Sequence, residues 1–140
     1  MIKSLIPSEA LEQKALVQWL NYHPILKNLF CKIDNEGSRK TVYKNGNPVN
    51  VGLFHAINMG LRPGVSDLFI YCPSGQFGGL WLEMKRKKTY SKAERSKSSW
   101  IAQENFINSV RSVGYAAFIC FGWENAKSII EIYLDSPNML

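Results

Sequence analysis

The amino-acid sequence predicts an α/β fold in which helices flank a mixed β-sheet. Helical periodicity of apolar residues marks both ends of the chain, and short apolar runs with the composition of strands lie between them. Hydrophobic residues make up 46% and charged residues 20% of the 140 residues, as in ordinary globular proteins. Since a chain of this length forms one compact core, we expect residues 1–140 to be a single domain.

The first expected helix begins after Ser8, a favourable N-cap, and ends near Asn21, before Pro24. Glu9 falls in its first turn, where a negative charge suits the helix dipole. With about 3.6 residues per turn, one apolar stripe is expected to face the core: Leu11, Ala15, Leu16, Trp19 and Leu20.

A short strand is expected at 29–33, with a turn after it at 34–37. The stretch 38–50 contains the turn-forming run Asn45-Gly46-Asn47-Pro48 and is interpreted as a hairpin-like loop or a mobile excursion. A short helix is expected at 51–59, where Gly60 ends it.

The second half of the chain supplies the centre of the sheet. Ser98 or Ser99 is a suitable cap for its first helix. The last apolar run, 115–121, lacks alternation, as expected for a strand that is covered on both faces. The expected order is a strand at 67–72, a strand at 80–85, a helix at 100–113, a strand at 115–121 and a helix at 123–134.

The net charge of +6 is concentrated in one window, because the rest of the chain is neutral. Such a run is either a solvated loop or a rim that binds phosphates, which clustered lysines and arginines attract. We interpret it as a nucleic-acid contact and add Arg62, which lies before the 67–72 strand. The basic residues of the window are Lys85, Arg86, Lys87, Lys88, Lys92, Arg95 and Lys97.

Two polar residues interrupt apolar helix faces. Glu12 falls near the middle of the first helix's apolar stripe, and a buried carboxylate needs a cation or strong donors. Gln103 falls within the apolar face of the 100–113 helix. Each residue has a structural alternative, a buried ion pair for Glu12 and a backbone contact for Gln103.

Alternation along 80–85 places Glu83 and Lys85 on one face of a central strand, and Asp67 begins the neighbouring strand. Two carboxylates held close together repel each other unless they share a cation. Oxygen ligands without His or Cys favour Mg²⁺ or Mn²⁺, and Lys85 can then position water or offset charge on a phosphate. A plain Glu83–Lys85 surface ion pair is the alternative.

An ordered set of motifs resembles the VRR-NUC nucleases of the PD-(D/E)XK superfamily, and the match covers nearly the whole chain. The motifs are Glu12-Gln13 with 15–19, the run 60–70, the run 79–85, Gln103, Gly114-Tyr115 and the run 120–126. The resemblance implies a restriction-endonuclease-like fold, similar to that of Holliday-junction resolvases.

The resemblance also implies roles. Asp67, Glu83 and Glu12 would hold the metal, Lys85 would be the catalytic lysine, and Gln103 would point at the site. The family usually has Pro before the aspartate, where this chain has Ser66. Because that Pro shapes a turn, its replacement leaves the assigned chemistry intact.

Together these observations predict a Mg²⁺- or Mn²⁺-dependent endonuclease that hydrolyses DNA phosphodiesters and selects junction, flap or fork structures. A non-catalytic or RNA-directed nucleic-acid-binding domain on the same fold is the alternative, and a basic interaction protein is a third. Since cutting both strands of a junction needs two active sites, a homodimer is expected.

We expect a cytoplasmic protein without a membrane span. No run approaches the ~20 apolar residues that cross a bilayer, and the N-terminal apolar run is too short for a signal peptide. The odd number of cysteines fits a reducing compartment, and Cys31, Cys72 and Cys120 are expected to be buried thiols.

Overall fold

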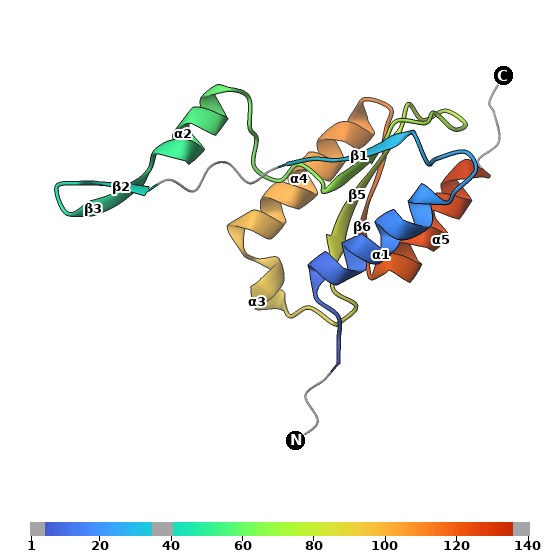
Figure 1. Ribbon diagram of the computed structural model, residues 1–140, viewed down its shortest axis with the longest axis horizontal. Helices are drawn as coiled ribbons and strands as arrows, with labels where there is room; N and C mark the ends of the chain where they lie inside the picture. Colours follow the sequence, from blue (N-terminus) through green and yellow to red (C-terminus); the bar gives the residue numbers. More distant parts are fainter. Residues whose placement is uncertain (1–4, 35–40, 136–140) are drawn as a thin grey trace.

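Four strands form the central sheet in the order β1-β4-β5-β6, as the computed structural model shows for the described residues, 5–34 and 41–135 (Figure 1). The β1–β4 and β4–β5 pairs are antiparallel and the β5–β6 pair is parallel, so the sheet is mixed as predicted. The strands are β1 (Phe30–Lys32), β4 (Leu68–Ile70), β5 (Leu80–Lys85) and β6 (Ala116–Phe121).

Helices cover both faces of this sheet. α1 (Glu9–Asn21) and α5 (Trp123–Leu134) pack on each other and on β5, and α5 also packs on β6. α4 (Ser98–Ser112) lies against β6 on the other side of the sheet (Figure 1). The predicted α/β arrangement is therefore confirmed, and it sets the start of α1 beside the central strand.

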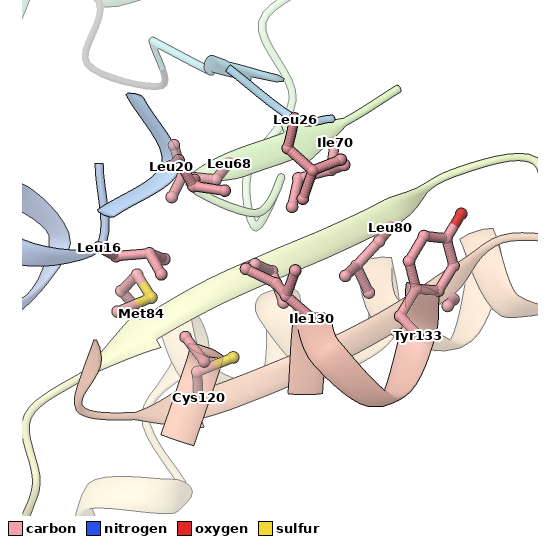
Figure 2. Packing of buried hydrophobic residues seen from close by; sticks show 13 residues of the cluster. Leu16, Leu20, Leu26, Leu68, Ile70, Leu80, Met84, Cys120, Ile130 and Tyr133 are labelled. Atoms are coloured by element: carbon pink, nitrogen blue, oxygen red, sulfur yellow. The ribbon is translucent and has the colours of Figure 1, made fainter. Parts of the chain in front are cut away.

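The core lies between the sheet and the α1–α5 layer (Figure 2). The predicted alternation on β5 is confirmed, because Leu80, Leu82 and Met84 are all fully buried in this core. Leu16 and Leu20 fill it from α1. The prediction for Leu11 was wrong: its side chain is 59% exposed, since the stripe facing the core runs along the Leu16–Leu20 edge of α1.

A hairpin and a short helix form a separate arm between β1 and β4, as Figure 1 shows. The hairpin joins β2 (Thr41–Lys44) to β3 (Asn47–Asn50) through Asn45 and Gly46, which have positive φ angles of 52° and 78°. Two such residues make the turn that matches the twist of paired strands. The predicted hairpin-like loop is confirmed over 41–50; residues 35–40, with most of the turn expected at 34–37, lie outside the described part.

The arm ends with α2 (Val51–Asn58), which confirms the predicted short helix. The side chain of Asn50 caps it by accepting a hydrogen bond from the Leu53 amide at 2.8 Å. Gly60 follows in the left-handed region, with a φ of 109°, and the chain then turns toward β4.

The predicted start of α4 was wrong. The helix begins at Ser98, so Lys97 is the N-cap and supplies no side-chain hydrogen bond. An additional helix, α3 (Lys92–Arg95), precedes it, and Ser91 and Glu94 form a reciprocal capping box at its start. Part of the basic window 85–97 is therefore a short helix rather than an open loop.

None of the helices in the described ranges is long and apolar enough to cross a membrane. All three cysteines are free thiols. Cys120 is buried as predicted and Cys72 is half-buried, but the prediction was wrong for Cys31, which is exposed on the edge strand β1.

Candidate metal centre and the basic segment

The antiparallel register of β4 and β5 brings Asp67 and Glu83 together. Leu68 pairs with Leu82, so the residue before β4 faces the residue after Leu82. One Asp67 carboxylate oxygen accepts a hydrogen bond from the Met84 amide at 2.8 Å, which fixes the side chain against β5. The sheet itself therefore sets these two carboxylates side by side.

Glu9, in the first turn of α1, is the third carboxylate of this group. One ligand oxygen each from Glu9, Asp67 and Glu83 lie within 4.8 Å of one another. Burial raises the pKa of all three groups. The effect is largest for Glu83, whose pKa rises to about 8 because burial and the neighbouring Asp67 both disfavour its charge.

Glu12, the acid that the sequence singled out, does not join this group. It is buried as expected, with 6% exposure, but its Oε2 accepts a hydrogen bond from the Trp123 amide at 2.6 Å. Its carboxylate therefore caps the N-terminus of α5, where a negative charge is favourable. Gly122, with a φ of 87°, allows this approach: a Cβ there would lie 3.3 Å from the same oxygen.

The signal that would have found Glu9 is its spacing. It precedes Glu12 by three residues and Leu16 by seven, so all three lie on one face of α1. Extending the inward stripe by one turn therefore reaches Glu9. Its place in the first turn of α1 by itself indicates only a favourable interaction with the helix dipole.

Lys85 lies beside the carboxylates on the same face of β5. Its Nζ is 3.7 Å from Glu83 Oε1 and 4.8 Å from the centre of the Trp100 ring. Both members of the pair are buried, at 10% and 3% side-chain exposure, which excludes the alternative of a surface ion pair. Lys85 thus makes a cation–π contact with Trp100 of α4 in addition to its pairing with Glu83.

An open cleft of about 820 Å³ gives solvent and ligands access to the group. Gln103 lines it from α4, and its Oε1 is buried without a hydrogen-bond partner among the described residues. Gly64 packs so closely on α4 that a Cβ would lie 2.3 Å from the Ala102 carbonyl, which holds the segment leading to Asp67 against this helix. Further lining residues that the sequence did not reveal are Gln13, Lys14, Gln18 and Lys32.

This donor set fits a hard divalent cation. Carboxylate and amide oxygens are the ligands that Mg²⁺ and Mn²⁺ prefer, and the group offers no His or Cys. Three clustered carboxylates are stable together only with protons or a cation between them. The unpartnered oxygen of Gln103 provides one more acceptor on the same cleft.

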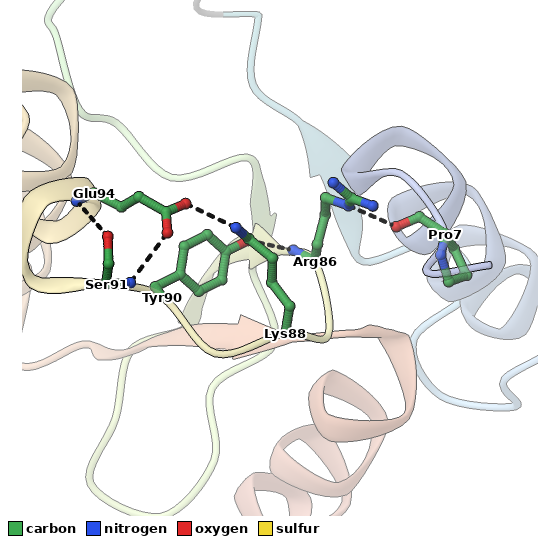
Figure 3. Close-up of polar contacts among 6 residues, drawn as sticks. All are labelled: Pro7, Arg86, Lys88, Tyr90, Ser91 and Glu94. Atoms are coloured by element: carbon green, nitrogen blue, oxygen red, sulfur yellow. Dashed lines mark hydrogen bonds and ion pairs between the residues drawn. The ribbon is translucent and has the colours of Figure 1, made fainter. Parts of the chain in front are cut away.

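The cations of the basic segment, residues 86–97, fall into two groups: some bind other groups of the protein, and the rest are exposed. Arg86 donates to the carbonyl oxygen of Ile6 at 3.0 Å. Figure 3 shows its second hydrogen bond, to the carbonyl oxygen of Pro7 at 3.1 Å, and the pairing of Lys88 with Glu94 at 2.8 Å. Two of the expected nucleic-acid contacts therefore have protein partners of their own.

The other expected contacts are more accessible. Lys87, Lys92 and Lys97 are exposed. Arg95 is exposed as well and lies 5.4 Å over the Trp100 ring. Arg62 is also exposed, and it donates to the carbonyl oxygens of Ile57 and Leu61.

The fold and the acidic cleft together define a mixed-sheet α/β domain of the kind that the motif resemblance implied. No family model matches the sequence, and no curated protein matches it. The fold is similar to that of a solved structure of a VRR_NUC domain protein, with a TM-score of 0.70 and 20% sequence identity over 95% of this chain and 93% of that chain. The chain therefore has the fold of a VRR_NUC domain.

Proposed function

We propose that this chain is a nuclease that uses Mg²⁺ or Mn²⁺ to hydrolyse DNA phosphodiester bonds. The observation that carries the proposal is the convergence of three carboxylates within 4.8 Å, beside a buried lysine, in an open cleft. The VRR_NUC fold of a protein that matches nearly the whole chain supports it.

Asp67, Glu83 and Glu9 would hold the cation, and Glu9 takes the place that the motif resemblance gave to Glu12. A bound divalent cation would supply Lewis acidity and lower the pKa of a coordinated water. Lys85 would donate hydrogen bonds to the attacking water or to a phosphate oxygen, where its charge offsets the developing negative charge. Gln103 would orient a water or the cation through its free oxygen.

Lys87, Lys92, Arg95 and Lys97 would contact the DNA backbone. Contacts to phosphates carry no information about base sequence. We therefore propose endonuclease cleavage that selects DNA by its structure, at junctions, flaps or forks. Cleavage of both strands of a junction would require a homodimer with one cleft in each copy.

The test is cleavage of duplex, flap, splayed-arm and four-way-junction DNA by the purified chain with Mg²⁺, with Mn²⁺ or with chelator. We expect metal-dependent cleavage that Asp67→Asn and Lys85→Ala each reduce by at least about 100-fold, since the first removes a ligand of the cation and the second removes a positive charge beside the reacting phosphate. DNA binding, measured separately, should persist in both variants.

Glu124→Gln is the matched control, because it removes a carboxylate from an exposed position on α5. It should cleave like the parent chain. Asp67→Asn that retains parent-level, metal-dependent cleavage would refute the proposed centre. Cleavage of RNA alone would instead support the RNA-directed alternative.

A further inference from the structure

The outer edge of β6 is a surface that the proposed nuclease chemistry does not use. β6 is the last strand of the four-stranded sheet. At its two ends the amides of Ala116 and Gly122 donate hydrogen bonds toward β5. Since alternate residues of a strand turn their backbone groups to opposite sides, Ala117, Ile119 and Phe121 present theirs at the free edge.

Side chains already cap the two ends of this free edge. Arg111 donates to the Ala117 carbonyl from Nε at 2.9 Å and from Nη2 at 2.6 Å. The Phe121 amide donates to Asn125 Oδ1 at 2.9 Å. Between these caps, the amide and carbonyl of Ile119 have no hydrogen-bond partner among residues 5–34 and 41–135. Caps of this kind protect an edge against a long strand, and here they leave one donor and one acceptor for a short one.

A hollow lies beside the middle of β6 on each face of the sheet. The hollow on the α5 face measures about 300 Å³, and its lining is apolar or aromatic: Phe77, Ala116, Phe118, Ile129, Ile132 and Tyr133. The hollow on the α4 face measures about 310 Å³ and contains three polar side chains, those of Glu104, Asn108 and Arg111. Phe118 and Ile132 are 39% and 71% exposed, so the apolar hollow is open to solvent at its rim.

Strand geometry determines which side chain each hollow would receive. A segment that runs antiparallel to β6 can exchange two hydrogen bonds with Ile119. Because side chains alternate, its next residue lies opposite Phe118 and points into the apolar hollow. The residue after that lies opposite Ala117, on the face from which Arg111 reaches the edge. A carboxylate there would pair with the Arg111 guanidinium in a charge-assisted hydrogen bond.

We propose that the free edge of β6 binds an extended segment of a partner protein in which a bulky apolar residue is followed directly by Asp or Glu. Such a segment adds a strand to an exposed sheet edge. Its acid complements Arg111, which a second copy of β6 would not do, because Ala116–Phe121 contains no acidic residue. Nucleic acid offers no apolar side chain for the hollow on the α5 face. This inference does not depend on the proposed metal chemistry.

The experiment measures binding of the fluorescent peptide Ser-Gly-Thr-Phe-Glu-Gly-Ser to the full chain by anisotropy, without metal or DNA. We expect saturable binding with the peptide's Thr opposite Ile119. Replacing its Phe by Ala or its Glu by Lys should each weaken binding at least about 10-fold, since each removes one of the two side-chain contacts. N-methylation of Thr should abolish binding, because the Ile119 carbonyl then loses its donor. N-methylation of Phe, whose amide points away from β6, should be tolerated.

Variants of the chain test the same contacts from the other side. Ile132→Asp, at the rim of the apolar hollow, should weaken binding at least about 10-fold. Arg111→Glu should reject the Glu peptide and bind the Lys peptide. Leu11→Asp, the control, adds the same charge at a 59% exposed apolar position on α1 and should bind like the parent chain.

Ile132→Asp keeps the proposal testable if Arg111→Glu folds poorly, which circular dichroism would show. The proposal is overturned by a parent chain that does not bind the peptide at millimolar concentration or by binding that survives N-methylation of Thr. Equal losses in Ile132→Asp and Leu11→Asp would overturn it as well. None of these results bears on whether the chain cleaves DNA.

Discussion

Glu9 and Glu12 lie one helical turn apart on α1 and have different partners. Glu9 reaches Asp67 and Glu83, whereas Glu12 accepts from the Trp123 amide at the start of α5. Periodicity correctly predicted that Glu12 is a buried anomaly. It did not reveal the partner, because which helix terminus meets α1 depends on how distant parts of the chain pack.

Glu12 and Glu9 are therefore expected to respond differently to substitution. Glu12→Ala removes the charged cap of α5 and should destabilise the fold by about 1–3 kcal/mol. Glu9→Gln removes one carboxylate from a repelling cluster, so it should leave thermal stability unchanged or raised and should weaken Mn²⁺ binding. Denaturant unfolding and calorimetric Mn²⁺ titration of both variants check this. If Glu12→Ala is as stable as the parent chain but binds Mn²⁺ poorly, Glu12 is a metal ligand and not a cap of α5.

The raised pKa of Glu83 makes the stability of the metal-free protein depend on pH. Its pKa is about 8 in the fold against an ordinary value of 4.5, so the folded state holds the proton more tightly. This contribution is fully present below pH 4.5 and is lost as pH rises through about 8. The melting temperature without metal should thus fall over this window, and Glu83→Gln should flatten the fall. An equal fall in both proteins would contradict the burial of this charge.

At the scale of elements, the helices and strands were largely predictable and their mutual contacts were not. α5 has the predicted bounds, and β5 lies where its alternation placed it. α3 was missed although Ser91-x-x-Glu94 is a capping-box pattern, because the run of lysines was interpreted only by its charge. The use of Arg86 to hold the segment before α1 joins residues about eighty positions apart, and no local pattern encodes it.

Arg86 is consequently expected to position α1 more than to bind DNA. Its guanidinium donates hydrogen bonds to the carbonyls of Ile6 and Pro7, which lie three and two residues before Glu9. Arg86→Ala should lower Mn²⁺ affinity about 10-fold, as is typical when a supporting contact behind a ligand is lost. Arg86→Lys should recover part of it. Lys87→Ala, its exposed neighbour, is the control and should leave Mn²⁺ affinity unchanged; equal effects at both positions would contradict the positioning role.

At the scale of the whole molecule, the distribution of charge separates three surfaces. The cleft gathers acids, the segment after β5 carries the positive excess, and α2 carries no charged residue. The location of the excess was readable from the sequence. The sequence did not show which of these cations are paired and which are accessible. Lys88 pairs with Glu94 only because α3 turns the chain so that the two side chains meet.

The location of charge, rather than its amount, should govern DNA affinity. Lys87→Ala/Lys92→Ala and Lys27→Ala/Lys44→Ala each remove two exposed lysines, so both lower the net charge from +6 to +4. Each lost phosphate contact reduces the slope of log affinity against log salt by about 0.9, so the first pair should flatten the slope by up to about two units. The second pair, on the α1–β1 connection and on the arm, should change it little. DNA binding measured by anisotropy over a salt series distinguishes the two, and equal slopes in both variants would mean that the protein attracts DNA only through its net charge.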